Sequence, residues 1–167
     1  MSSSATRILL ITGVAGSGKS TLGQQAAARL GWPYFEADDF HPPANTAKMA
    51  AGVPLDDADR APWLAAIRAR MDEVRATGGH AVFTCSALKA SYRTTLLGGT
   101  DDVALIFLSG DFETILARVR GRQGHFMKEE LVRSQFEALE PPAEALTLDV
   151  RQSPEALLAQ ILGHVQH

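Results

Sequence analysis

Between Gly13 and Ser20, glycine, lysine and serine residues are spaced so that they can bind phosphate. The stretch reads Gly-Val-Ala-Gly-Ser-Gly-Lys-Ser and satisfies the pattern G-x-x-x-x-G-K-[ST]. A loop with few side chains lets backbone N–H groups surround phosphate oxygens, and the start of a following helix adds partial positive charge. The pattern therefore predicts a nucleotide phosphate site. The alternative is a tight glycine-rich turn with an incidental Lys-Ser pair.

The segments on either side of this loop favour the phosphate site. Residues 7–12 are an apolar, β-branched run of strand length, and residues 21–30 have the pattern of an amphipathic helix that ends before Gly31. Lys19 is expected to reach the β- and γ-phosphates of ATP, and the Ser20 hydroxyl to complete a Mg²⁺ shell. The predicted nucleotide-binding residues in this loop are Gly13, Ala15, Gly16, Ser17, Gly18, Lys19, Ser20 and Thr21.

Acidic residues follow the next candidate strand, residues 32–35. Glu36, Asp38 and His41 would lie at the carboxyl end of that strand, which is where open parallel sheets bind ligands. On its own the segment would be read as a solvated turn rich in Asp and Pro. The phosphate loop upstream makes a substrate site the better interpretation.

The rest of the chain alternates strand and helix patterns. Apolar runs at 80–85, 103–108 and 146–150 predict three more strands, with helical patterns between them. We therefore expect one three-layer α/β domain over residues 1–167, with a five-stranded parallel sheet flanked by helices. A composition of 46% hydrophobic and 21% charged residues is typical of a soluble globular protein.

The charge and the single cysteine exclude several classes. A net charge of −3 indicates neither a nucleic-acid partner nor an anionic membrane. Cys85 alone forms no internal disulfide and no common zinc site, and we expect it to be a small buried residue. The short polar start of the chain has no signal-peptide pattern, so the cytoplasm is the expected compartment.

Three arginines, Arg118, Arg120 and Arg122, are followed by Gln123-Gly-His125. They form either a solvated helix face or a lid, at about residues 118–130, that closes over a triphosphate. The phosphate loop favours the lid. Two other cations, Lys48 and Arg60, lie in turn-like sequence after the acidic segment and can converge on an anionic substrate.

The common phosphate-loop classes are distinguished by other motifs. The Asp-x-x-Gly and Asn-Lys-x-Asp motifs of small GTPases do not occur in the chain. The runs 80–85 and 103–108 do not end in an acidic residue, which an ATPase motor would use for Mg²⁺. A compact kinase that acts on a small molecule remains.

Ordered strings over nearly the whole chain resemble the gluconokinases, within the shikimate kinase and nucleoside monophosphate kinase group. The strings are Phe35–Pro42, Lys48–Met49, Gly52–Asp57, Asp59–Arg60, Pro62–Leu64, Cys85–Lys89, Tyr92–Arg93, Gly124–Met127, Ser134–Phe136 and Leu139–Pro141. The resemblance implies transfer of the ATP γ-phosphoryl group to the 6-hydroxyl of D-gluconate by a cytoplasmic homodimer. One residue departs from the pattern, because gluconokinases commonly have Gly where this chain has Ala37.

The resemblance and the chemistry of phosphoryl transfer imply the same roles. Lys19, Mg²⁺ on Ser20, and Arg122 would stabilise the transferred group, with Arg118 stacked on adenine. Asp38 would accept the proton of the 6-hydroxyl, and Glu36 would hold the water shell of the metal. The predicted substrate residues are Asp38, His41, Lys48, Arg60, Ser86, Lys89, Arg93, His125 and Gln135.

Three points stay open at this level. Arg60, Lys89, Arg93 and His125 compete as the partner of the substrate carboxylate. A kinase of another small hydroxy acid such as shikimate is an alternative, disfavoured because Cys85-Ser-Ala replaces the usual Gly-Gly-Gly string. A catalytically silent nucleotide-binding module is the other alternative.

Overall fold

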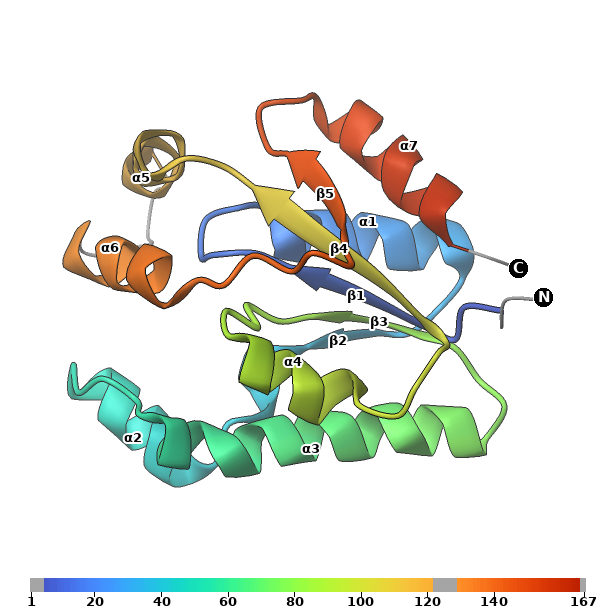
Figure 1. Ribbon diagram of the computed structural model, residues 1–167, viewed down its shortest axis with the longest axis horizontal. Coiled ribbons are helices and arrows are strands. Elements are labelled where there is room, and N and C mark those ends of the chain that lie inside the picture. The colour runs from blue at the N-terminus through green and yellow to red at the C-terminus, as the bar shows by residue number, and fades with distance from the viewer. Residues whose placement is uncertain (1–4, 122–128, 166–167) are drawn as a thin grey trace.

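The computed structural model describes residues 5–121 and 129–165. Its single sheet has five parallel strands in the order β2-β3-β1-β4-β5 (Figure 1). The strands are β1 (Ile8–Thr12), β2 (Tyr34–Glu36), β3 (Ala81–Thr84), β4 (Val103–Ser109) and β5 (Leu146–Asp149). The predicted five-stranded parallel sheet is confirmed. Because strand order reverses beside β1, the phosphate loop that follows β1 lies at the switch point where such sheets bind ligands.

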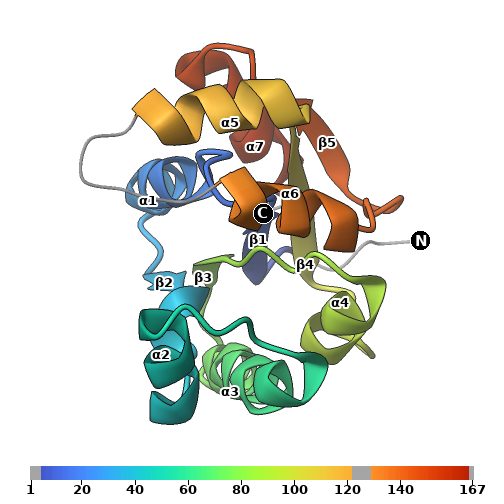
Figure 2. The same ribbon diagram turned by 90° about the vertical axis from the view of Figure 1, so that its left-hand side faces the viewer.

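Helices cover both faces of this sheet. The described helices are α1 (Lys19–Leu30), η1 (a 3₁₀ helix, Ala37–Phe40), α2 (Pro43–Ala50), α3 (Asp57–Ala76), α4 (Ala90–Leu97), α5 (Phe112–Gly121), α6 (Glu129–Ala138) and α7 (Pro154–His164). In the view toward the carboxyl ends of the strands, α5 and α6 lie above the end of β3 and α2 lies below it (Figure 2). Among the described residues, no helix is both long and apolar enough to cross a membrane.

The central strand β1 shows why the apolar runs are continuous. Leu9 and Ile11 pack in the cluster that α1, α5 and α7 cover, whereas Ile8 and Leu10 pack in the cluster under α3 and α4. All four side chains are fully buried. A strand that is covered on both faces needs apolar residues at every position, so the three-layer arrangement follows from the sequence of β1.

Two helix starts differ from the sequence-based expectation. Lys48 lies in α2 and Arg60 in the first turns of α3, so the interpretation of both as turn residues was wrong. The reason for the early start of α3 is a reciprocal cap, in which the Asp56 side chain accepts from the Asp59 N–H and Asp59 accepts from the Asp56 N–H. The helix after β3, α4, begins only at Ala90, because residues 85–88 form an irregular turn in which Ala87 has a φ of 42°.

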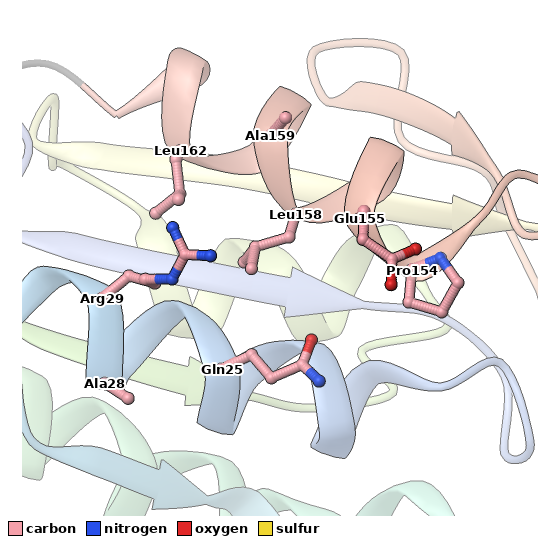
Figure 3. A pocket seen from close by; sticks show the side chains of 8 residues that line it. All are labelled: Gln25, Ala28, Arg29, Pro154, Glu155, Leu158, Ala159 and Leu162. Atoms are coloured by element: carbon pink, nitrogen blue, oxygen red, sulfur yellow. The ribbon is translucent and has the colours of Figure 1, made fainter.

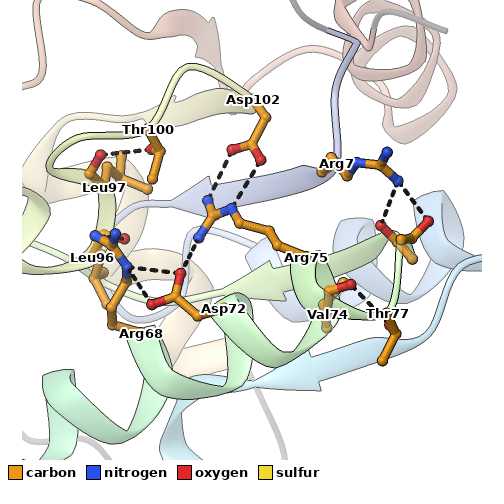
Figure 4. Close-up of polar contacts among 12 residues, drawn as sticks. Arg7, Arg68, Asp72, Val74, Arg75, Thr77, Leu96, Leu97, Thr100 and Asp102 are labelled. Carbon is orange, nitrogen blue, oxygen red and sulfur yellow. Dashed lines mark hydrogen bonds and ion pairs between the residues drawn. The ribbon is translucent and has the colours of Figure 1, made fainter.

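Polar contacts connect α3 to the amino ends of the strands, at the end of the sheet opposite to the phosphate loop (Figure 4). The Arg75 guanidinium of α3 makes two 2.9 Å hydrogen bonds to Asp102, directly before β4, and one of 2.8 Å to Asp72. Arg7, before β1, donates to the carbonyl of Gly78 at 2.6 Å, before β3. These contacts tie α3 and three strand starts together, and they lie at the end of the sheet away from the phosphate loop.

Candidate active site

The phosphate loop has a backbone that only glycine allows at its centre. Gly16 has a φ of 83°, and a Cβ on it would lie 2.6 Å from Cγ2 of Val119 on α5. Gly18 also has positive φ and forms the N-cap of α1, so the helix begins at Lys19. The first N–H groups of α1 therefore face the loop, which is the arrangement that binds anions.

Two polar contacts in this loop bear on a phosphate ligand. The Ser17 hydroxyl is buried and has no hydrogen-bond partner among the described residues. A buried unpaired hydroxyl is costly, so it fits a site completed by ligand oxygens. The Ala15 N–H donates to Oε1 of Gln135 on α6 at 2.7 Å. Gln135, predicted to be a substrate residue, thus contacts the phosphate loop itself.

Ser20 is joined to Glu36 by a short hydrogen-bond chain. The Ser20 hydroxyl donates to Oε1 of Glu36 at 2.6 Å, and the Tyr34 hydroxyl donates to Oε2 at 2.6 Å. Tyr34 also lies 2.9 Å from the hydroxyl of Thr84, which is buried in β3. Burial and the neighbouring Glu36 raise the pKa of Tyr34 to about 12, so the phenol keeps its proton and acts as a donor.

The packing of Tyr34 depends on a glycine in α1. A Cβ on Gly23 would lie 2.8 Å from the Tyr34 ring and 2.5 Å from the Thr84 methyl group. The ring therefore fills the space between α1 and the sheet and directs its hydroxyl to Glu36. Sequence reasoning missed Tyr34 and Thr84, because nothing in the linear pattern shows that adjacent strands bring them together.

Cys85 follows the end of β3 and is the chain's single cysteine. Burial raises the pKa of its thiol to about 12. Cys85 is buried and keeps its proton, in agreement with the expectation that it has no chemical role. Asp38 of η1 is exposed and follows β2, whose carboxyl end lies at the same edge of the sheet as the phosphate loop.

A pocket of about 420 Å³ opens beside the phosphate loop. Arg118 of α5 lies on it and donates to the carbonyl oxygen of Val150 after β5. The lining residues are Gly16, Ser17, Gly18, Thr21, Leu22, Arg118, Val150, Gln152, Pro154 and Leu157. A part-apolar pocket next to a phosphate loop suits a nucleoside. Its wall from 150–157 was missed from the sequence, although it follows the fifth strand at the same sheet edge.

Ion pairs connect the helices that follow η1. Lys48 of α2 lies 2.9 Å from Asp59 of α3, and Lys89 lies 3.1 Å from Asp57. The Tyr92 hydroxyl of α4 donates to Asp57 at 2.6 Å. These hydrogen bonds, first that from Tyr92 and then that from Lys89, hold the pKa of Asp57 below its ordinary value. Both lysines therefore have a carboxylate partner within the chain.

Arg60 and Arg93 have uncharged hydrogen-bond partners. Arg60 donates to the Tyr92 hydroxyl at 3.2 Å, and its guanidinium lies 5.7 Å from the centre of that ring. Arg93 is buried and donates to the main-chain carbonyls of Ala87 at 2.8 Å and Glu140 at 2.7 Å. Arg93 thus supports the irregular turn after β3, in which Ser86 is partly exposed.

The turn after β2 is held by an aromatic pair. His41 stacks on Trp63 of α3 with 4.4 Å between ring centres and 9° between planes. The Trp63 indole N–H donates to the Ala37 carbonyl at 2.7 Å. Ala37 is buried, and its φ is not positive, so its methyl group fits the turn without backbone strain. Arg122, His125 and the centre of the predicted lid lie outside the described residues.

A larger hollow, about 690 Å³, lies between α1 and α7 (Figure 3). Arg29 and Gln25 of α1 face Glu155 and Leu158 of α7 across it. These residues lie on the facing sides of the two helices, and the phosphate loop does not line the hollow. We therefore place the active site at the smaller pocket and the adjoining edge of the sheet.

A phosphate loop at the switch point of a parallel sheet, with an acidic turn beside it, defines a P-loop kinase of small molecules. The family model described as "Shikimate kinase" matches residues 15–164. The gluconokinase of Gluconobacter oxydans (strain 621H) is 42% identical over 96% of this chain and 92% of its own length. The probable gluconokinase of Xenopus tropicalis is 39% identical over 95% and 93%. The chain belongs to the gluconokinase family.

Solved structures agree with this assignment. The crystal structure of a gluconokinase from Sinorhizobium meliloti 1021 has a TM-score of 0.83 and 38% identity, over 96% of this chain and 90% of that chain. The resemblance found in the ordered strings of the sequence is thereby confirmed. As a P-loop kinase, the chain uses ATP.

Proposed function

We propose that this chain transfers the γ-phosphoryl group of ATP to the 6-hydroxyl of D-gluconate, giving 6-phospho-D-gluconate and ADP. The observation that carries the proposal is a phosphate loop and an acidic turn at the carboxyl ends of strands in one parallel sheet, in a chain 42% identical to a gluconokinase. A cation on the donor side and a carboxylate on the acceptor side are what in-line phosphoryl transfer requires.

On the donor side, the residues of the phosphate loop bind and neutralise the triphosphate. The N–H groups of residues 16–20, the Ser17 hydroxyl and the Lys19 ammonium group bind phosphate oxygens. The nucleoside occupies the pocket beside Arg118, whose guanidinium provides a flat surface for the base. Arg122 remains a predicted lid residue that adds positive charge to the transferred group.

The oxygen atoms around Ser20 fit a Mg²⁺ ion. Ser20 and Glu36 place a hydroxyl and a carboxylate oxygen 2.6 Å apart, and Mg²⁺ prefers such hard oxygen donors. Ser20 would hold the ion directly and Glu36 through its water shell. When bound, the ion neutralises charge on the phosphates.

On the acceptor side, Asp38 accepts the hydrogen bond and then the proton of the 6-hydroxyl. We assign the substrate carboxylate to Arg60, because Lys48 and Lys89 already pair with Asp59 and Asp57. Arg60 instead contacts the hydroxyl and ring of Tyr92, so its charge remains available to an anion. His41, Ser86 and Gln135 provide further polar contacts, and His125 and Arg93 remain predictions.

The test is a substrate panel with product identification. Purified protein with Mg-ATP should form ADP faster with D-gluconate than with shikimate or a nucleoside monophosphate, and the product should be the 6-phosphate. Stimulation by one of the other acceptors and not by gluconate would overturn the assignment. We also propose that the enzyme works in the cytoplasm and that it is a homodimer. Size-exclusion chromatography with light scattering would measure the molar mass and so check the dimer.

A further inference from the structure

Asn45 is a buried polar residue that links two segments of the acceptor side. Its side chain is 3% exposed. Its Nδ2 donates to the main-chain carbonyl of Asp59 at 2.8 Å and lies 3.2 Å from Nδ1 of His41. Burying an amide is costly unless its hydrogen bonds are satisfied, so these two contacts decide how the amide is oriented.

The carbonyl of Asp59 determines that orientation. A carbonyl oxygen only accepts hydrogen bonds, so the NH₂ group of Asn45 must face it, and a flipped amide would place two oxygens together. The second N–H of the same group is directed to His41 Nδ1. Nδ1 must then be the acceptor, and the imidazole proton must reside on Nε2.

The surroundings of the ring favour its neutral form. Burial lowers the pKa of His41 below its ordinary value of 6.5; the charge of Asp38 acts in the opposite direction, and that of Arg60 adds to the lowering. Lys48 and the Asp59 carboxylate, which lie on the helices joined by Asn45, pair with each other at 2.9 Å. The stack on Trp63 holds the plane of the ring.

We propose that Asn45 is a positioning residue that holds His41 as the neutral Nε2–H tautomer, so that His41 donates one hydrogen bond to a hydroxyl oxygen of the acceptor substrate. The identity of that substrate as a sugar acid rests on the function proposed above. His41 then selects for a hydroxyl on the substrate chain, while the carboxylate is left to a permanent cation, Arg60. Substrate affinity consequently gains nothing from protonation of His41.

The first test is spectroscopic and needs no substrate. Long-range ¹H–¹⁵N correlation spectra of the full-length, ¹⁵N-labelled protein report which imidazole nitrogen carries the proton. The His41 signals are identified by their loss in His41→Gln. At pH 7 we expect an unprotonated Nδ1 and a protonated Nε2, with a titration midpoint below 6.5. A protonated Nδ1, or a charged ring at pH 7, would overturn the proposal.

The second test separates donation from charge. His41→Gln keeps a neutral N–H donor and should hold the KM for gluconate within about threefold, whereas His41→Phe should raise it about tenfold with little change in kcat. If both variants raise KM equally, the hydrogen bond to substrate is refuted. Thr46→Ala, an exposed neighbour of Asn45 on α2, is the matched control and should leave KM unchanged.

Asn45→Asp tests the positioning role. A carboxylate accepts from Nδ1–H and so favours the charged imidazole. The variant should show a KM for gluconate that changes between pH 6 and pH 8, where the wild type does not, together with a raised His41 midpoint in the spectra. An unaltered tautomer and midpoint would refute the role of Asn45. Absence of gluconate turnover in the wild type would instead overturn the proposed function and leave the spectroscopic result valid.

Discussion

The donor side and the acceptor side of this site are built differently. On the donor side one contiguous segment, residues 13–21, would supply most of the groups that we propose to bind phosphate, and glycines with positive φ shape its backbone. On the acceptor side η1, α2, α3 and α4 each supply one or two side chains, and pairs such as Lys48–Asp59 and Lys89–Asp57 connect the helices. The proposed phosphate site is thus formed mainly by one chain segment, whereas the proposed substrate site depends on how several helices pack together.

Charge is also distributed differently on the two sides. The donor side adds helix N–H groups to the charge of Lys19 and contains the Ser17 hydroxyl, which has no hydrogen-bond partner within residues 5–121 and 129–165. On the acceptor side, carboxylates of the chain neutralise two of the candidate cations. The charge of a cation that is already paired attracts a substrate anion less, because the partner carboxylate repels that anion. Counting lysines and arginines in the sequence therefore overstates the positive charge available to the substrate.

The largest effect is expected at the donor side. Lys19→Met should lower kcat/KM by about 10³-fold, because a positioned charge on the transferred phosphoryl group is lost. Steady-state kinetics with gluconate would measure this. Arg29→Met, an exposed residue of the same helix, is the control and should leave the kinetics unchanged. A loss below tenfold in Lys19→Met would move the catalytic charge elsewhere.

Asp38→Asn tests the base on the acceptor side. We expect kcat to fall by about 10²- to 10³-fold while the Kd for ATP, measured by calorimetry, stays the same. Asp39→Asn changes the adjacent exposed carboxylate of η1 in the same way and serves as the matched control. Equal effects of the two substitutions would refute the assignment of the base to Asp38.

Arg60→Gln distinguishes free from paired cations. The KM for gluconate should rise about 10- to 100-fold, as expected for loss of a charged hydrogen bond, with the KM for ATP unchanged. Lys89→Gln should have a smaller effect, because Lys89 is paired with Asp57. A larger effect in Lys89→Gln would mean that substrate displaces Asp57 and would reverse the assignment.

Tyr34→Phe tests the hydrogen-bond chain that joins Ser20 of the phosphate loop, through Glu36, to Tyr34 of β2. The variant removes the hydroxyl that bonds Glu36 at 2.6 Å and keeps the ring that packs on Gly23. Support of this kind to a metal site is worth about tenfold or more, so the Mg²⁺ concentration for half-maximal rate should rise about tenfold. Tyr92→Phe is the control on the acceptor side. If the rate of Tyr34→Phe depends on Mg²⁺ concentration just as the wild-type rate does, the role of Tyr34 in supporting the metal site is refuted.

Arg75→Met should lower the stability of the protein without changing the binding of ATP or gluconate. Its contacts with Asp102 and Asp72 lie at the opposite edge of the sheet. Leaving the partly buried Asp102 without its partner should lower the free energy of unfolding by about 1–3 kcal/mol. Urea denaturation would measure the loss, and unchanged KM values for ATP and gluconate would show that the two edges act independently.

Sequence reasoning reached most of the fold and the donor side because both leave local patterns. The apolar runs predicted all five strands, and the glycine spacing located the loop. It interpreted Arg60 as a turn residue, although Arg60 lies in the first turns of α3, because the cap formed by Asp56 and Asp59 lies in a segment that looks like a turn. It also did not reveal the role of Arg93, whose partners include the carbonyl of Glu140, 47 positions away.

What the sequence by itself determined was the class of chemistry. The glycine spacing from Gly13 to Ser20 is a local pattern that predicts phosphate binding, and the ordered motifs identify the family. Only the tertiary structure decided which polar side chains are committed to the fold and which remain for a substrate. Asn45, Arg93 and Lys89 are all polar in sequence, yet their hydrogen-bond partners come from other elements. Those partners are set by the packing of helices on the sheet, which no local pattern records.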